Sequence, residues 1–333
     1  MSQMETKSFS ISAVIPAYNC AEYINRTIDS VLAQSRAADE IIVVDDGSTD
    51  KTGEVIASYG SKVKYIHQEN AGASAARNAG INAASGEWIA FLDGDDEWYP
   101  QKLQVQVELL KRNPHLEWAT ANFDRCLCGE NQRGPDITQK KGEILLGEKE
   151  YFDNYFSAHM NQAGGWTGTM IIKRKTLEEA GLFRIGQRRA NDLDMWWKIA
   201  HRWPQIGYSP EPLAVYHMGT PSSISQGSFD KELHCELMER HLKLADQAGS
   251  TDNFKPFATW TIRKWLRAML FHEAVGDIRS IMHQFKDLLP KSYQMIMRLL
   301  TTFPSVTANS CHLLSQINRK LHFRQRLVRR PKR

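Results

Sequence analysis

Three carboxylates fall within four residues at Asp93-Gly94-Asp95-Asp96, directly after an apolar run at residues 88–92. The run has the length and composition of a buried strand, and ending such a strand on several charges is costly unless a cation pairs with them. In an extended segment Asp93 and Asp95 point the same way, and carboxylate oxygens suit Mg²⁺ or Mn²⁺. The pattern therefore predicts a divalent metal site. The alternative is a solvated acidic turn, because acidic glycine turns are common.

Two further expected strands, at residues 11–15 and 41–44, also end in residues that can bind a ligand. The residues that follow these two strands are Pro16, Tyr18 and Asn19, and Asp45 and Asp46. Proline cannot donate to a sheet ladder, so it marks the end of the first strand. Ligands of open α/β sheets bind at the carboxyl ends of the strands. One crevice is therefore expected to collect an aromatic ring, a pair of acids and the metal site.

Helices are expected between these strands, because apolar residues recur at helical spacing through residues 21–34 and because Pro100 suits the first turn of a helix at 100–112. Buried strands that alternate with helices predict an α/β fold with a largely parallel sheet. No G-x-G-x-x-G or Walker sequence follows a strand, which disfavours a dinucleotide enzyme or a P-loop NTPase.

A second acidic segment, at residues 189–198, leads into an amphipathic helix and contains Asn191, Asp192, Asp194 and Trp196. Acids suit a helix N-terminus, so the plain interpretation is that Asp192 and Asp194 cap the helix. A carboxylate that faces the crevice could instead take a proton from a bound hydroxyl. A glycine-rich loop around Trp166 could bring backbone close to a ligand, or it could be an ordinary turn.

The 333 residues are 42% hydrophobic and 24% charged, as in ordinary soluble proteins, and the net charge of +4 does not by itself indicate nucleic-acid binding. The five cysteines are scattered, which predicts free thiols in a reducing compartment and hence a cytoplasmic protein. The N-terminus has no signal-peptide core, and no run of 18 uncharged apolar residues predicts a membrane span.

The last hundred residues are expected to be helical, at 229–244 and 257–285. Residues 295–314 are apolar but interrupted, and residues 319–333 hold eight Lys or Arg and no acid. This pairing predicts peripheral contact with the inner face of an anionic membrane. The alternative is a solvated tail with no partner.

Four motifs in order, VIPAYN, VVDDGSTD, NAGASAARNAGI and FLDGDD, resemble the family 2 glycosyltransferases of GT-A fold over roughly residues 12–224. The resemblance implies a Rossmann-like, mostly parallel mixed sheet flanked by helices, with a catalytic domain at 1–228 and a helical C-terminal region with a basic tail at 229–333. It also implies metal-assisted transfer of a sugar, with inversion, from a nucleotide-diphosphate donor to an acceptor hydroxyl. Cell-surface polysaccharide, glycolipid or glycan biosynthesis is the expected setting.

The resemblance further implies roles for individual residues. Those expected at the donor are Pro16, Tyr18, Asn19, Asp45, Asp46, Arg77, Asp93 and Gly94. A Mn²⁺ or Mg²⁺ ion is expected on Asp95, with Asp93 and His217 assisting. Asp192 is the expected general base, and the acceptor side is expected to hold Trp166, Asn191 and Trp196.

Two positions depart from the family pattern. Asn191 stands where the family usually has Glu, which leaves the base in place but puts a role for the preceding acid in doubt. His217 lies where an arginine is usual, so its role is less well supported. For Arg77 the alternative is a surface ion pair, and for both tryptophans it is a place in the core.

Two other functions are compatible with parts of the sequence. The first is a non-catalytic relative that binds a nucleotide sugar as an assembly partner, although Asp95 and Asp192 are both retained. The second is nucleic-acid binding through the basic tail, which the lack of a paired basic and aromatic module disfavours.

Overall fold

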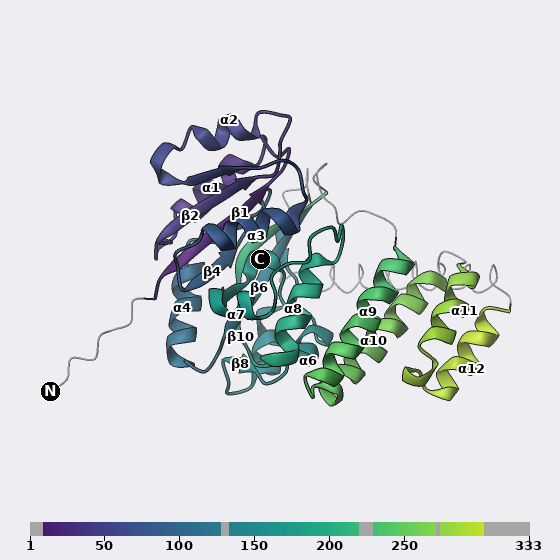
Figure 1. The fold of residues 1–333 in the computed structure, drawn as a ribbon. Helices are drawn as coiled ribbons and strands as arrows, with labels where there is room; N and C mark the ends of the chain where they lie inside the picture. The colour runs from purple at the N-terminus through teal and green to yellow at the C-terminus, as the bar shows by residue number, and fades with distance from the viewer. Residues whose placement is uncertain (1–8, 128–132, 220–228, 271–273, 303–333) are drawn as a thin grey trace, which may run out of the picture. The chain divides into compact units, whose positions relative to one another are not determined.

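The computed structural model describes residues 9–127, 133–219, 229–270 and 274–302 (Figure 1). The chain forms two compact units. The first comprises Met1–Phe229 with Leu244–Ser250, and the second comprises Asp230–Lys243 with Thr251–Arg333. Among the described residues, no helix is both long and apolar enough to cross a membrane.

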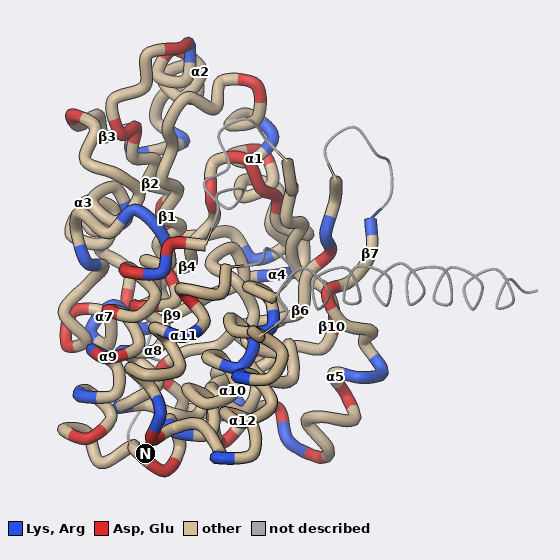
Figure 2. Tube along the Cα trace, turned by 90° about the vertical axis from the view of Figure 1, so that its right-hand side faces the viewer, with Lys and Arg blue, Asp and Glu red and all other residues tan. Residues whose placement is uncertain are grey.

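The first unit contains a ten-stranded sheet in the order β3-β2-β1-β4-β9-β6-β10-β5, with β7 paired to β6 and β8 to β10. The strands are β1 (Ile11–Ala17), β2 (Glu40–Asp45), β3 (Lys64–His67), β4 (Trp88–Phe91), β5 (Glu97–Trp98), β6 (Trp118–Leu127), β7 (Arg133–Pro135), β8 (Tyr151–Phe152), β9 (Ile171–Lys173) and β10 (Ile206–Met218). Figure 2 shows β3, β2, β1, β4 and β9 in succession.

Strand direction brings several strand ends to one edge of this sheet. β3, β2, β1 and β4 run parallel to one another, and β6 runs parallel to β10. β9 is antiparallel to both β4 and β6, so these two strands run the same way. The carboxyl ends of β1, β2, β4, β6 and β10 therefore lie at the same edge, where a ligand site is expected.

The helices are α1 (Ile24–Leu32), α2 (Thr52–Ala57), α3 (Ala73–Ala83), α4 (Lys102–Arg112), α5 (Gln139–Leu146), α6 (Tyr155–Met160), α7 (Arg174–Glu179), α8 (Asn191–Arg202), α9 (Lys231–Gln247), α10 (Thr251–Leu270), α11 (Val275–Gln284) and α12 (Lys291–Leu300), with short 3-10 turns η1 (Gly60–Lys62), η2 (Thr167–Thr169) and η4 (Lys286–Leu288). The α/β class and the mostly parallel mixed sheet are confirmed. The single helix expected at 257–285 is wrong, because α10 ends at Leu270 and α11 begins at Val275.

Helices cover both faces of the sheet. Successive residues of a strand point to opposite sides of the sheet, and in β1 the residues on both sides are buried. On one face, Ala13 and Ile15 of β1 belong to a core cluster that also contains Ile28 of α1 and Val107 of α4.

On the other face Val14 lies against α3, where a Cβ on Gly80 would come 2.3 Å from Cγ1 of Val14. Phe91, the partner of Val14 in β4, contacts Trp196 of α8 on the same face. This burial fixes the frame that carries the strand ends.

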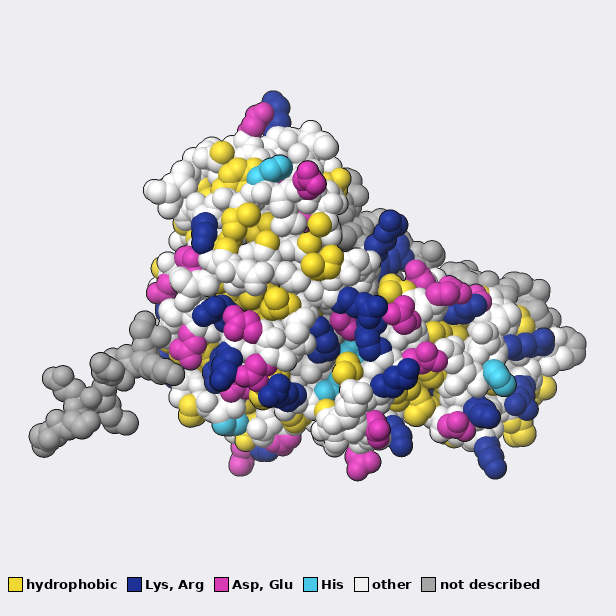
Figure 3. Space-filling model, in the orientation of Figure 1, with side chains coloured by type: hydrophobic (Ala, Val, Ile, Leu, Met, Phe, Trp, Pro, Cys, Tyr) yellow, Lys and Arg dark blue, Asp and Glu magenta, His cyan; other side chains and the backbone are white. Residues whose placement is uncertain are grey.

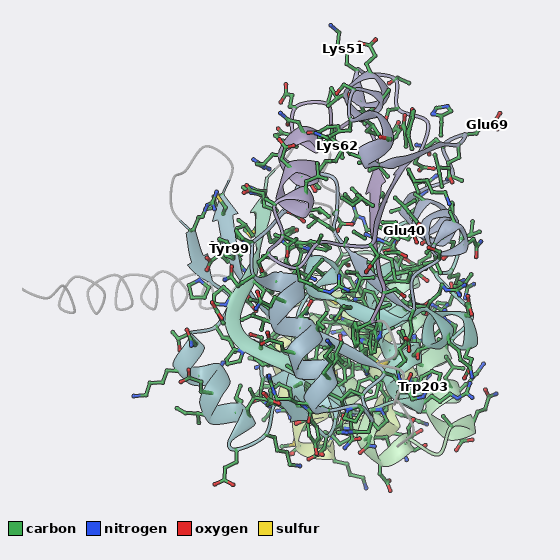
Figure 4. The ribbon with its side chains drawn as sticks, turned by 90° about the vertical axis from the view of Figure 1, so that its left-hand side faces the viewer. Glu40, Lys51, Lys62, Glu69, Tyr99 and Trp203 are labelled. Carbon is green, nitrogen blue, oxygen red and sulfur yellow. The ribbon has the colours of Figure 1, made fainter. Side chains whose placement is uncertain are left out.

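Glu40, labelled in Figure 4, is the first residue of β2 and lies at the edge of the sheet opposite the expected site. Its Oε1 accepts hydrogen bonds from the Ser12 hydroxyl at 2.5 Å and from the Ser85 N–H at 2.6 Å. These bonds lower the pKa of Glu40 even though burial opposes them. The residue thus has a structural role far from the carboxyl ends of the strands.

Candidate active site

The acidic turn after β4 lies directly against the end of β1. A Cβ on Gly94 would come 3.0 Å from Sγ of Cys20 and 3.1 Å from the carbonyl oxygen of Pro16. The carbonyl of Asp95 accepts from Arg26 Nη2 at 2.7 Å, which joins the turn to α1. A side chain at position 94 would therefore fit only if Cys20 or the backbone at Pro16 moved by a few tenths of an ångström.

The three carboxylates of the turn have different surroundings. Asp93 and Asp95 are partly exposed, whereas Asp96 is 1% exposed. One oxygen of Asp96 accepts from the His217 N–H at 2.8 Å, and the other is buried without a hydrogen-bond partner. Burial, followed by the charges of Asp95 and Asp93, raises the pKa of Asp96 well above its usual range. The raised pKa favours the neutral form of Asp96, so the negative charge of the turn lies on Asp93 and Asp95.

A divalent ion fits this turn only if other ligands complete its shell. Within the described ranges, no group of three or more His, Cys, Asp or Glu side chains could hold a metal by itself. Mg²⁺ commonly uses one or two carboxylates and takes its remaining ligands from phosphate and water. Asp95, with Asp93 beside it, matches that kind of site.

Arg77 of α3 joins the acidic turn to the N-terminus of α8. Its Nη2 lies 2.6 Å from Oδ1 of Asp93, and its Nη1 donates to Oδ1 of Asn191 at 3.1 Å. The guanidinium carbon lies 5.4 Å from the ring centroid of Phe183. The side chain is buried, so this is not a surface ion pair. One cation therefore joins the acidic turn to the start of α8, which lies 114 residues from Arg77 in the chain.

Asp192 and Asp194, both in the first turn of α8, face different surroundings. Asp192 is partly exposed, and its Oδ1 accepts from the Leu193 N–H at 2.8 Å. Burial raises its pKa, the charge of Arg77 opposes the rise, and the charge of Asp93 adds to it. Asp194 is 1% exposed, and its Oδ2 lies 3.9 Å from Nζ of Lys198. Asp192 is thus the carboxylate that combines solvent access with proximity to the acidic turn.

Asp45, at the end of β2, is buried and surrounded by donors from the protein. It accepts from the Ser48 N–H at 2.9 Å and from the Tyr65 hydroxyl at 3.0 Å, and Nδ1 of His67 lies 3.3 Å away. Burial would raise the pKa of Asp45, but these hydrogen bonds outweigh it and the pKa is lowered. The carboxylate is ionised and shapes its own loop.

Asp46 organises the loop that leads into α3. Its Oδ1 accepts from the Gln68 amide at 2.6 Å and from the Ala71 N–H at 3.0 Å, and its Oδ2 accepts from the Gly72 N–H at 2.8 Å. A contact from Asp46 to the donor would share these oxygens with the protein, and it stays a prediction.

Asn19 fastens the end of β1 to the loop after β2. Its N–H donates to the Ser48 hydroxyl at 3.0 Å, and its Oδ1 accepts from the Thr49 N–H at 2.8 Å. The residue has φ 45°, a left-handed conformation that Asn tolerates better than most residues. The preceding Tyr18 is 46% exposed, so its ring is open to a planar ligand.

The two tryptophans expected on the acceptor side lie in different environments. Trp196 is 1% exposed, and its ring centroid lies 5.7 Å from that of Phe183, so it belongs to the core. Trp166 is partly exposed and lies 4.8 Å from Phe123 and 5.4 Å from Tyr216 between ring centroids. This second group lies at the carboxyl ends of β6 and β10, the same edge as the acidic turn.

His217 is held by a neighbour that the sequence reasoning missed. Its Nε2 lies 2.7 Å from Oε1 of Glu97, and Arg26 Nε lies 3.0 Å from the same oxygen. The bond with His217 lowers the pKa of Glu97, burial opposes it, and Arg26 adds to the lowering. Glu97 directly follows the acidic turn, and that position was the available signal. Nε2 of His217 would have to leave Glu97 before that nitrogen could reach a metal.

A second polar link lies beside this network. Tyr99 is labelled in Figure 4, and its hydroxyl donates to Oδ2 of Asp124 at 2.6 Å. Burial and this carboxylate raise the pKa of Tyr99 to about 12. The phenol therefore stays protonated and holds the end of β6 next to the segment that follows the acidic turn.

Comparison with known proteins is consistent with these features. Residues 12–181 match the model of glycosyl transferase family 2. An uncharacterized glycosyltransferase of Bacillus subtilis, EpsJ, is 45% identical over 247 residues, which are 72% of this chain and 68% of that protein. An uncharacterized glycosyltransferase of Rickettsia typhi is 32% identical over 200 residues, which are 59% of this chain and 60% of that protein.

A solved structure gives an independent view of the fold. The chain is similar to S. aureus TarS 1–349 in complex with UDP-GlcNAc, with a TM-score of 0.69 and 18% sequence identity over 90% of this chain and 88% of that one. The chain spans 31% and 60% of the length of two Rickettsia relatives that it matches. Since the family model matches half of the sequence, the chain belongs to glycosyl transferase family 2, with the GT-A fold.

Proposed function

We propose that the chain transfers a sugar, of the hexosyl type, from a nucleotide-diphosphate donor to an acceptor hydroxyl with inversion at the anomeric carbon. The observation that carries this proposal is the position of Arg77, which contacts both Asp93 of the acidic turn and Asn191 beside Asp192. A donor at the turn and a base on α8 are thereby held on the same edge of the sheet. Biosynthesis of a cell-surface polysaccharide, glycolipid or glycan is the proposed setting.

The donor half of the site is proposed to lie over the ends of β1, β2 and β4. The open ring of Tyr18 would stack on the base, and the loops held by Asp45 and Asp46 would form its frame. A Mn²⁺ or Mg²⁺ ion on Asp95, with Asp93 beside it, would neutralise charge on the leaving diphosphate. The complex of TarS with UDP-GlcNAc supports a nucleotide sugar as the donor class.

Asp192 is proposed as the general base. Its raised pKa makes it a stronger base than an ordinary carboxylate, while Arg77 keeps the ionised form accessible. Inversion requires the base and the leaving diphosphate on opposite sides of the anomeric carbon. Arg77 and Asn191 would act as positioning residues that hold Asp192 at that distance from the turn. Trp166 would form part of the acceptor wall.

A non-catalytic protein that binds a nucleotide sugar remains the second candidate, and no contact in the described part of the chain favours it over the enzyme. We also propose that the protein works in the cytoplasm and contacts an anionic membrane peripherally, where a lipid-linked acceptor would be within reach. Protein-linked and free carbohydrate acceptors are the other classes.

A donor panel tests the proposal in two stages. Thermal shift with nucleotide sugars, beginning with UDP-GlcNAc, should show a higher midpoint with Mn²⁺ than without it, and Tyr18→Ala should reduce that shift. Release of nucleoside diphosphate should then require both donor and acceptor. Binding of a donor with no turnover on lipid-linked, protein-linked or free carbohydrate acceptors would favour the non-catalytic candidate. Absence of any donor-dependent shift would overturn both.

A further inference from the structure

α12 carries apolar side chains that the described protein leaves open. Met295 and Leu299 are each 69% exposed, and Ile296 is 51% exposed. At about 100° per residue these three side chains lie within one face of the helix. The opposite side is anchored, because Met297 is 1% exposed. α12 is therefore packed on one side and presents an apolar strip, here defined as Met295, Ile296 and Leu299, on the other.

Cations border this apolar strip on both sides. Lys291 and Arg298 are exposed on one flank of α12, and the helix contains no acid. On the other flank the guanidinium carbon of Arg263, from α10, lies 4.6 Å from the ring centroid of Tyr293. In Figure 3 hydrophobic and basic side chains lie next to one another on the visible surface of the α11–α12 region. An apolar centre with a basic rim is typical of helices that lie in a membrane interface.

The distribution of charge along the chain indicates which partner this helix fits. Ten of the 42 Lys and Arg residues, and none of the 38 Asp and Glu residues, lie in 291–333. That segment carries a net charge of +10, so residues 1–290 carry −6. A net charge of +10 beside an apolar strip fits an anionic bilayer, which offers both negative charge and apolar depth.

We propose that the apolar strip of α12 inserts into the interface of an anionic lipid bilayer, with Lys291, Arg298 and Arg263 at the level of the head groups. Long basic side chains can keep their charge in water while their stems cover apolar surface. The proposal rests on the peripheral membrane contact proposed above and names the surface that makes it, and it is independent of the glycosyl-transfer chemistry.

Flotation with vesicles tests the strip directly. Full-length protein should float with vesicles of phosphatidylcholine containing about a third phosphatidylglycerol and should bind pure phosphatidylcholine weakly. Met295→Ser with Leu299→Ser should lower the bound fraction at least about tenfold. The matched control is Ile144→Ser with Ile185→Ser, which removes two apolar side chains that are 71% and 64% exposed elsewhere. The control should bind as the parent protein does.

Several results would overturn the proposal. Equal flotation of the strip variant and the control, or equal binding to neutral and anionic vesicles, would exclude an anionic interface at α12. A change in oligomeric state on removing the strip, with vesicle binding unchanged, would assign it to contact between copies.

Discussion

The pair Asp192 and Asp194 permits a test of the base in which one carboxylate serves as the control for the other. Asp192→Asn keeps the size of the side chain and an oxygen that can still accept the Leu193 N–H, which lies 2.8 Å away. It removes a charge that burial already disfavours, so the free energy of unfolding should change by no more than about 1 kcal/mol. Turnover should fall by about 10²–10⁴, the range for losing a general base, or about 3–5 kcal/mol of transition-state stabilisation.

Asp194→Asn should show the opposite division of effects. Asp194 is 1% exposed, and the Nζ of Lys198 lies 3.9 Å from it. Removing one partner of a fully buried ion pair costs about 3–5 kcal/mol, and the loss should be smaller here because Lys198 is 17% exposed. The thermal midpoint should therefore fall clearly while kcat of the folded enzyme stays within about threefold of the parent, because the carboxylate is buried rather than open to an acceptor.

The assay is release of nucleoside diphosphate under saturating donor, with thermal unfolding measured on the same samples. The pH profile adds a second readout. A base must be deprotonated, so activity should be lost as the pH falls through the pKa of Asp192, and burial moves that limb above the range of an ordinary Asp. If Asp192→Asn retained turnover while Asp194→Asn was inactive, the assignment of the two carboxylates would be reversed. If both retained turnover, α8 would not supply the base.

Three other results are expected. EDTA should abolish transfer, and Mn²⁺ or Mg²⁺ should restore it; full activity without divalent ions would contradict a metal on Asp95. Gly94→Ala should destabilise the fold by about 1–3 kcal/mol in urea unfolding and weaken donor binding, whereas Gly134→Ala, whose Cβ would meet no atom within 4 Å, should do neither. Burial lowers the pKa of Lys102 well below its usual range, so the free energy of unfolding should rise with pH by about 1.4 kcal/mol per unit between the folded and unfolded pKa values of Lys102. Lys102→Met should remove this slope. If the parent and the variant had the same pH dependence of unfolding, Lys102 would be charged in the folded protein.

Local patterns predicted the frame of the protein well. Short apolar runs, each followed by a polar cluster and a helical period, indicate a strand and helix whatever the rest of the chain does, and β1, β2 and β4 occur where these runs lie. The sequence also indicated which strand ends carry acids. It could not indicate where α10 ends, because the apolar stripe continues through the break that separates it from α11.

Local patterns in the sequence could not predict contacts between segments that are far apart in the chain. The exposure of Trp166 and Trp196 depends on which residues of the folded chain surround each ring. The sequence around the two tryptophans gives no means of telling which ring is buried. The partners of Asp46 are an amide and two backbone N–H groups more than twenty residues away. The sequence predicts Asp46 as a donor-binding residue, but its carboxylate oxygens already accept hydrogen bonds from the protein.

The contacts of Arg77 explain why an amide at position 191 suits this site. A guanidinium can bond two acceptors in a fixed geometry while lying against a ring, as it does with Asp93, Asn191 and Phe183, and an ammonium cannot. A carboxylate at 191 would add a second negative charge beside Asp192, compete for Arg77 and raise the pKa of the base further. The neutral Asn191 accepts the same hydrogen bond without that charge. The positive charge of Arg77 therefore stabilises chiefly the ionised forms of Asp93 and Asp192, the two carboxylates that the proposed reaction needs in that form.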